Sequence, residues 1–380
     1  MRTLNFLIKP ASGLCNMRCQ YCFYQDEVSQ RQSPDLGVMS YETSELLISR
    51  AMEAVDKNGR ISFAFQGGEP TVAGLEFFRH FVERVKTQNH KNAYVSYSIQ
   101  TNGLSLDREW AEFFQQEGFL VGISLDGDKS LHDEFRLDTT GKGTWNRVKS
   151  ALDLLLKLQV EVNLLCVVTK RCAKSPERVY NSLKKTGVKY FQFIPCLDPL
   201  EVPRGTQPYS LTPNDYGSFL RTLFDLWFRD WQKGNYTSIR LFDDYVHLAM
   251  GLPASTCAAS GSCGSYLVVE SDGSVYPCDF YVLDTWKLGD LTSHTLEELS
   301  HSPQALRFLQ DGWERPAPCS RCPWKSLCFG GCKRDWITEA NGQKSNYFCS
   351  AFQTFFAYAA PRLNLIAKAE WAARRQFHRL

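Results

Sequence analysis

An alternation of short and long segments in the first half of the chain most constrains its fold. From residue 5 to about residue 195, short runs rich in β-branched and apolar residues alternate with longer segments of helical period. We expect strands at Asn5–Lys9, Ile61–Gln66, Ala93–Gln100, Leu120–Leu125, Glu161–Val168 and Tyr190–Ile194. We expect helices between them at Tyr41–Lys57, Leu75–Thr87, Asp107–Glu117, Trp145–Leu158 and Pro176–Thr186. This alternation predicts an α/β fold, a partial (β/α)6 TIM-like barrel with a parallel sheet.

Polar or glycine-rich clusters follow five of these strands directly. They are Cys15–Cys22, Gly67–Pro70, Thr101–Gly103, Asp126–Gly127 and Cys196–Pro199. Because active sites of such barrels lie at the carboxyl ends of the strands, we expect the clusters to meet at one rim. Loops also favour Gly, Asn, Asp and Pro for conformational reasons alone, so each cluster by itself is compatible with an ordinary turn.

Composition narrows the class of protein without naming a function. The 380 residues carry a formal net charge of +2, which gives no electrostatic reason to expect a nucleic-acid partner. The apolar run at the N-terminus is too short for a signal peptide, and no apolar stretch reaches the roughly 18 residues of a membrane helix. We therefore expect a cytoplasmic protein without membrane partners. In a reducing compartment its 14 cysteines favour metal binding or catalysis over disulfides.

The second half of the chain has a different character. A helix is expected from Pro213 to Gln232, capped by Thr212. A cysteine-rich region follows, with a strand at Tyr266–Glu270 and a turn at Ser271–Gly273, and from Ala351 we expect a helix broken at Pro361. These changes predict three parts: a core over 1–235, a cysteine-framed domain over 236–350 and a C-terminal helix over 351–380.

A first group of cysteines, Cys15, Cys19 and Cys22, has the spacing CxxxCxxC. Three thiolates leave one iron of a four-iron cubane open to a chelating small molecule. The spacing resembles the signature of the radical S-adenosylmethionine superfamily, and Gly67-Gly68-Glu69-Pro70 resembles the GGE-type motif of that family. The resemblance implies a 4Fe-4S cluster that binds S-adenosylmethionine, with cofactor contacts from Tyr21, Gly68, Glu69, Ser124, Arg136 and Leu197. A zinc knuckle is the alternative for these cysteines.

Eight further cysteines follow: Cys257 comes first, and the other seven form the pattern Cx9GxxxxC, CxxCx5Cx3C and a distant last cysteine. The pattern resembles the SPASM domain, a twin-cluster extension of peptide-modifying radical enzymes. The resemblance implies one auxiliary 4Fe-4S cluster on Cys257, Cys263, Cys278 and Cys332, and a second on Cys319, Cys322, Cys328 and Cys349. Two zinc sites are the alternative, because CxxC pairs also suit tetrahedral zinc. The roles of Cys166, Cys172 and Cys196 stay open.

Longer stretches resemble the anaerobic sulfatase-maturating enzymes over nearly the whole chain. They include Leu7–Pro10, Phe63–Pro70, Gln100–Gly103, Cys196–Leu200 and Val268–Asp284. The resemblance implies oxidation of a cysteine or serine in a CxPxR or SxPxR segment of a sulfatase to Cα-formylglycine. It implies Asp279 as the base that accepts the thiol or hydroxyl proton, with an external electron donor such as flavodoxin or ferredoxin.

Tyr24 and Gln66 stand beside the first cysteine group and the glycine motif, where they could contact the incoming peptide. Core packing is the alternative for these two residues. The rival function is thioether or carbon–carbon crosslinking of a precursor peptide by another enzyme of the same superfamily. A zinc-binding module without catalysis is the rival from a different class.

Overall fold

A computed structural model describes residues 3–377 of the chain, which divide into two compact units. The first unit contains the described residues up to Leu165, together with Pro199–Val202 and Gly264–Leu309. The second contains Cys166–Asp198, Pro203–Cys263 and the described residues from Gln310 onward. The boundaries at 235 and 350 expected from the sequence stay predictions, since compactness and function need not divide a chain at the same place.

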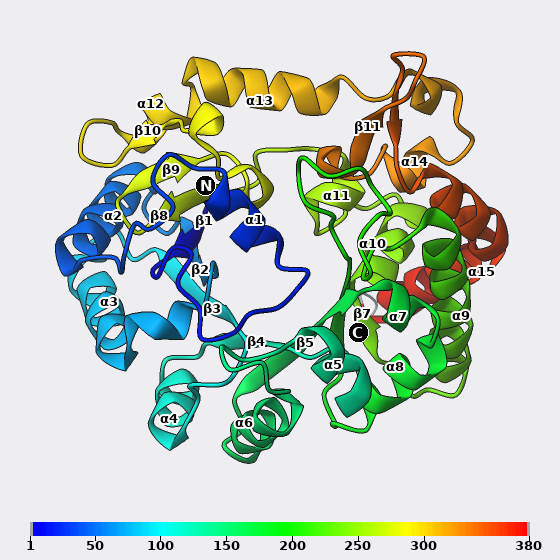
Figure 1. The fold of residues 1–380 in the computed structure, drawn as a ribbon, viewed down its shortest axis with the longest axis horizontal. Coiled ribbons are helices and arrows are strands. Elements are labelled where there is room, and N and C mark those ends of the chain that lie inside the picture. Colours follow the sequence, from blue (N-terminus) through cyan, green and yellow to red (C-terminus); the bar gives the residue numbers. More distant parts are fainter. Residues whose placement is uncertain (1–2, 378–380) are drawn as a thin grey trace. The chain divides into compact units, whose positions relative to one another are not determined.

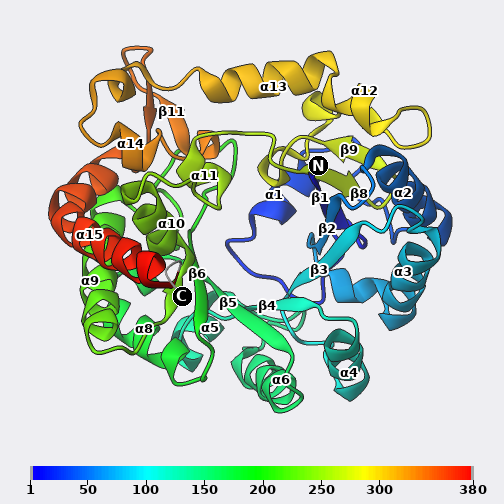
Figure 2. The ribbon, with the colours of Figure 1, turned by 180° about the vertical axis from the view of Figure 1, so that it is seen from behind.

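The first unit is built on parallel strands that pair in chain order. These are β1 (Thr3–Lys9), β2 (Arg60–Phe65), β3 (Tyr94–Thr101), β4 (Leu120–Ser124) and the part of β5 (Glu161–Val168) that belongs to this unit. Alternate residues of β2 and β5 are buried, as expected for strands that pack helices on one face. Figures 1 and 2 show β1 to β4 side by side, with the helices outside them. All five strands agree with the predicted ones to within two residues.

Amphipathic helices cover the outer face of this sheet. They are α2 (Tyr41–Ala54), α3 (Leu75–Gln88), α4 (Arg108–Gln116) and α6 (Trp145–Lys157). Ser40 and Asp107 cap the first and third of these by accepting backbone N–H groups of Thr43 and Trp110. Between the helices lies a dense aromatic core that includes Phe63, Phe65, Phe78, Phe81 and Phe119. The core holds the strand ends, and hence the loops that follow them, in place.

Three short helices that follow the ends of β1, β2 and β4 are absent from the sequence-based expectations. They are α1 (Phe23–Ser29), α5 (Lys129–Phe135) and the single-turn helix Pro70–Ala73. Each has seven residues or fewer, which is too short for a periodic pattern to stand out. They matter for function, because each begins in or directly after one of the polar clusters at the strand ends.

A distant segment of the chain extends the sheet beyond β1. Strand β8 (Leu267–Glu270) pairs in parallel with β1, and β9 (Ser274–Tyr276) and β10 (Gly289–Asp290) continue in antiparallel fashion. Strand β1 therefore has a partner on both sides. The predicted strand at Tyr266–Glu270 and the turn that ends in Gly273, whose φ is +85°, are confirmed. Helices α12 (Leu296–Ser300) and α13 (Pro303–Trp313) follow.

The second unit combines helices with small sheets. Strand β6 (Tyr190–Pro195) pairs in parallel with β7 (Ser238–Ile239), and β11 (Trp336–Thr338) pairs with β12 (Lys344–Asn346). Its helices are α7 (Lys170–Ala173), α8 (Pro176–Lys184), α9 (Pro213–Gln232), α10 (Arg240–Ala249), α11 (Cys257–Ser260), α14 (Lys325–Cys328) and α15 (Cys349–Phe377). Thr212 caps α9 as predicted, by accepting the N–H of Asp215.

The expected break at Pro361 is wrong. Helix α15 runs through Pro361 as one helix of 29 residues that begins at Cys349, two residues before the expected start. Proline removes one internal hydrogen bond and does not by itself end a helix whose flanks are held by packing. Ala359 and Leu363 on either side are fully buried. Residues 378–380 of the expected helix lie outside the described residues. Within residues 3–377, no helix is long and apolar enough to cross a membrane.

Candidate active site

The first cysteine group lies on the loop between β1 and α1. Burial raises the pKa of the Cys15 thiol to about 11 and that of Cys19 to about 12, and it also raises the pKa of Cys22. The charges of the neighbouring thiols raise the pKa of Cys15 and Cys19 further. Three half-buried thiols that lie in one another's electric field ionise together most readily beside a compensating cation. The loop therefore fits the iron of a cluster, which requires thiolates.

The glycine-rich segment after β2 packs directly on this cysteine loop. Gly68 donates its N–H to the Ser12 carbonyl at 2.7 Å, and Glu69 donates its N–H to the Leu14 carbonyl at 2.8 Å. A Cβ atom on Gly68 would lie 2.2 Å from the Leu14 carbonyl oxygen, so no other residue fits there without separating the loops. The two predicted cofactor loops are thus one structural element.

The Glu69 side chain ties this element to the end of β3. Glu69 is buried, with 1% of its surface exposed. Its carboxylate accepts hydrogen bonds from the Thr101 hydroxyl and the Asn102 N–H, both at 2.7 Å. Burial raises the pKa of Glu69, while these donors and Thr71 act to lower it. Glu69 was expected to contact the cofactor. In the structure both oxygens of its carboxylate accept hydrogen bonds from other groups of the protein.

Tyr21 and Arg136, also expected to contact the cofactor, meet at one carboxylate. The Tyr21 hydroxyl donates to Asp126, and Arg136 Nε donates to the same carboxylate at 2.8 Å. Arg136 is buried, and its charge acts to lower the pKa of Cys19. Ser124 accepts a hydrogen bond from Gln100 at 3.0 Å inside the sheet. Leu197, the last predicted cofactor contact, lies after β6 in the second unit.

Asp126 was not singled out by sequence reasoning as a site residue, although its cluster was noted. The available signal was its place directly after β4, at the rim to which the cysteine loop also belongs. Its carboxylate joins Tyr21 of the cysteine loop to Arg136 at the end of α5. A buried carboxylate shared in this way holds both side chains in one geometry.

The predicted base Asp279 is buried next to the ends of β1 and β2. Its Oδ1 atom lies 2.5 Å from Lys9 Nζ, and its Oδ2 atom accepts a hydrogen bond from Gln66 Nε2 at 2.8 Å. Lys9 has no exposed surface, and its ammonium stands 3.6 Å from the centre of the Tyr24 ring. Pairing of β8 with β1 brings this distant segment to the strand ends. Asp279, Gln66 and Tyr24 therefore share one site.

Lys9 is the residue of this site that sequence reasoning missed. It was named only as the end of a predicted strand and as part of the stretch Leu7–Pro10 that carries the family resemblance. The available signal was a lysine on an apolar strand directly before the cysteine loop, because a buried lysine needs an anionic partner.

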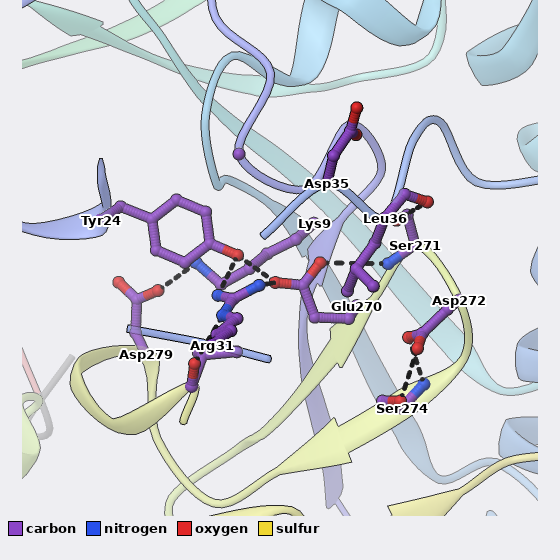
Figure 3. A network of polar contacts seen from close by, with 12 residues as sticks. Lys9, Tyr24, Arg31, Asp35, Leu36, Glu270, Ser271, Asp272, Ser274 and Asp279 are labelled. Atoms are coloured by element: carbon purple, nitrogen blue, oxygen red, sulfur yellow. Dashed lines mark hydrogen bonds and ion pairs between the residues drawn. The ribbon is translucent and has the colours of Figure 1, made fainter. Parts of the chain in front are cut away.

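A second buried ion pair continues the network, as Figure 3 shows. Arg31 Nη1 lies 2.8 Å from Glu270 Oε1, and Arg31 Nη2 donates to the Tyr24 hydroxyl at 2.8 Å. The Tyr24 hydroxyl in turn donates to Glu270. The Tyr24 hydroxyl thus both donates and accepts a hydrogen bond within the protein, and the face of the Tyr24 ring lies against Lys9. The expected peptide contact of Tyr24 stays a prediction.

Four predicted ligands of the second auxiliary cluster lie together in the second unit. Burial raises the pKa of Cys328 to about 11, and the charges of Cys319, Cys349 and Cys322 raise it further. Within residues 3–377, no three His, Cys, Asp or Glu side chains come together as a single metal ion would require. A cubane presents a separate iron atom to each thiolate, so its ligands can stand farther apart.

The predicted ligands of the first auxiliary cluster fall in both units. Cys257, Cys263 and Cys332 belong to the second unit, and Cys278 belongs to the first. Cys278 Sγ lies 3.8 Å from the Tyr266 hydroxyl, directly before Asp279. Cys166, Cys172 and Cys196 are all buried.

The parallel sheet, the three-cysteine loop and the glycine segment packed on it define a class of radical enzymes. Residues 10–183 match the radical SAM superfamily, and residues 261–323 match an iron-sulfur cluster-binding domain, SPASM. The cysteine-type anaerobic sulfatase-maturating enzyme of Clostridium novyi is 44% identical over 97% of this chain and 98% of its own length. The serine-type enzyme of Bacteroides thetaiotaomicron is 30% identical over 97% and 92%. The chain belongs to the family of anaerobic sulfatase-maturating enzymes.

Solved structures agree with this assignment. Native anSMEcpe with bound AdoMet and Cp18Cys peptide is similar with a TM-score of 0.92 and 42% identity, covering 97% of this chain and 99% of that chain. SuiB of Streptococcus suis bound to its precursor peptide SuiA has a TM-score of 0.62 at 17% identity, covering 90% and 74%. The second likeness shows the fold alone.

Several expectations from the sequence are therefore confirmed. They are the family, the partial-barrel fold with its SPASM domain and C-terminal helix, the radical enzyme class, and the cofactors, 4Fe-4S clusters and S-adenosylmethionine. The roles of individual residues stay predictions.

Proposed function

We propose that this chain oxidises a cysteine, a serine or both in a sulfatase segment of the CxPxR or SxPxR type to Cα-formylglycine. The carrying observation is the buried Asp279 carboxylate, held by Lys9 and Gln66 at the strand ends, in a chain 44% identical to cysteine-type enzymes of that activity. The lower identity of 30% to a serine-type enzyme supports cysteine as the preferred substrate.

The proposed cofactor residues are the ones that the family resemblance implies. Cys15, Cys19 and Cys22 would hold one 4Fe-4S cluster, with Tyr21, Gly68, Glu69, Ser124, Arg136 and Leu197 around its S-adenosylmethionine. The eight cysteines from Cys257 to Cys349 would hold two auxiliary clusters. When bound, these groups would supply a 5′-deoxyadenosyl radical for removal of a hydrogen atom from the substrate β-carbon and would provide an acceptor for the remaining electron.

The protein's own part in the reaction is to position the peptide and to remove one proton. Asp279 would accept the thiol or hydroxyl proton of the substrate. Lys9 and Gln66 each contact a different oxygen of Asp279, which holds its plane and leaves a second lone pair on each oxygen for the substrate. Tyr24 would support Lys9 through the face of its ring.

The partners we propose are a sulfatase peptide and an external electron donor such as flavodoxin or ferredoxin, in the cytoplasm. The peptide is supported by the structure of the relative anSMEcpe with a bound peptide. The cytoplasm is supported by the spacing of the cysteines, because 11 of the 14 fall into iron–sulfur patterns, which need a compartment that keeps thiols reduced.

The test is anaerobic incubation of the cluster-loaded enzyme with S-adenosylmethionine, a reductant and synthetic CxPxR or SxPxR peptides. Mass spectrometry should detect 5′-deoxyadenosine together with an aldehyde-bearing peptide. Formation of 5′-deoxyadenosine without aldehyde on either peptide would show that the proposed substrate is wrong. A crosslinked peptide in its place would favour the rival activity.

A further inference from the structure

Asn102 follows β3 in the motif Gln100-Thr101-Asn102-Gly103, which the proposed function does not use. The residue is 7% exposed, and its backbone N–H is held by Glu69 at 2.7 Å. Gly103, with a φ of +80°, turns the chain directly after it. The Asn102 backbone is therefore held in part by groups other than its own side chain.

The orientation of the Asn102 amide is decided by its neighbours. Its oxygen accepts the backbone N–H of Leu104 at 2.9 Å, so its NH₂ group must point the other way. That NH₂ group donates to Asn16 Oδ1 at 2.8 Å. The Asn16 amide is oriented as well, because its oxygen accepts this bond. Its own NH₂ group therefore faces the Ser105 hydroxyl, to which it donates at 3.0 Å. The chain of bonds leaves one orientation for both amides.

The consequence is an N–H group aimed at a proposed cluster ligand. Asn102 Nδ2 lies 3.7 Å from Cys15 Sγ, a normal distance for a hydrogen bond to sulfur. The backbone N–H of Met17 contacts the same sulfur at 3.4 Å. The contact from Asn102 comes from a side chain and can be removed by substitution, whereas the contact from Met17 comes from the backbone of the cysteine loop.

We propose that Asn102 tunes the reduction potential of the radical-generating cluster through this bond to Cys15, as a positioning residue. The proposal rests on the proposed role of Cys15 as a ligand. Reduction adds one negative charge to the cluster and its thiolates, and a donor at a ligand sulfur stabilises the more negative form. Asn102 thus raises the potential and makes the cluster easier to reduce.

The experiment compares midpoint potentials in the holoenzyme. Of the clusters present, the one that binds S-adenosylmethionine is the one whose electron paramagnetic resonance signal changes when that compound is added. Asn102→Asp keeps an acceptor for the Leu104 N–H but loses the donor to sulfur and adds a negative charge. Asn102→Leu loses the donor without adding charge. Asn146→Leu, at an exposed position on α6, is the matched control.

We expect the midpoint potential of this signal to be more negative in Asn102→Leu than in wild type, and more negative again in Asn102→Asp. Asn146→Leu should match wild type. Equal potentials in all four proteins would overturn the proposal. So would failure of both Asn102 variants to assemble the cluster while Asn146→Leu assembles it, because Asn102 would then act in folding alone.

A separate arm tests the assumption about Cys15. Cys15→Ala should lose the signal that responds to S-adenosylmethionine. If the signal survives in Cys15→Ala, the proposed ligand set is wrong. If it is lost in Cys15→Ala but the Asn102 variants keep the wild-type potential, only the tuning role is wrong.

Discussion

Replacing Lys9 by methionine removes the cation from a fully buried ion pair. The pair joins Lys9 Nζ to Asp279 Oδ1 at 2.5 Å, and their side chains are 0% and 6% exposed. Methionine fills a similar volume but leaves the Asp279 carboxylate with Gln66 as its remaining side-chain donor. The Tyr24 ring also loses the ammonium that stands 3.6 Å from its centre.

The size of the effect follows from the burial of both partners. Removing one member of a buried pair typically costs about 3–5 kcal/mol, because the other charge stays in a poor solvent. A desolvated cation–π contact adds up to about 2 kcal/mol. At about 2–4 °C per kcal/mol for a unit of this size, we expect the apparent Tm to fall by roughly 10 °C.

The assay is a thermal scan at a fixed rate for Lys9→Met, Asp279→Asn and the double variant. The double variant should lose less stability than the sum of the single variants, because it leaves neither charge uncompensated. Lys129→Met is the matched control: its partner is Asp133, four residues on, and the Lys129 side chain is 56% exposed, so its loss should cost about 1 kcal/mol or less. Additive losses, or a Lys9→Met variant as stable as Lys129→Met, would refute this reasoning.

Three further predictions follow from the described contacts. Asp279→Asn should still cleave S-adenosylmethionine but lose most aldehyde formation, measured on the same peptide sample; a wild-type aldehyde yield would exclude Asp279 as the base. Burial, with the charge of Arg136, lowers the pKa of His132 to about 4, below the ordinary value near 6.5. The folded state therefore favours the neutral ring, and its stability should fall by about 2 kcal/mol between pH 7 and pH 5 in a urea titration. His132→Gln should flatten that slope, and an unchanged slope would contradict the assignment. Gly68→Ala should reduce bound iron and S-adenosylmethionine together, because its Cβ would lie 2.2 Å from the Leu14 carbonyl oxygen; wild-type values for both would show that the loops can separate without cost.

Much of the first unit could be predicted because its strands obey local rules. Strands such as Glu161–Val168 alternate buried and less buried residues, and this period is visible in the sequence. Short elements such as α5 (Lys129–Phe135) were missed, because seven residues hold too few turns to show a period. The break expected at Pro361 in the C-terminal helix was wrong, since packing of Ala359 and Leu363 outweighs the local preference of proline.

The residues of the candidate site also divide into those that a local pattern in the sequence reveals and those that depend on a distant partner. Cys15, Cys19 and Cys22 could be named together because they stand on one short loop, where spacing in the sequence limits spacing in space. Lys9 and Asp126 were missed, because each is important through a partner on another element. The signal for Lys9 was a charge on an apolar strand, and its partner Asp279 lies 270 residues away.

The sequence by itself determined the class of chemistry, because the spacing of thiolates on a loop limits which metal group they can bind. It also determined the parallel sheet, because periodicity is a local property. Only the tertiary structure decided which polar groups meet. Pairing of β8 with β1 brings Asp279 to Lys9, and the turn after β3 brings Asn102 to Cys15, 87 residues away. Such contacts depend on which strands become neighbours, and no local pattern in a single sequence encodes that choice.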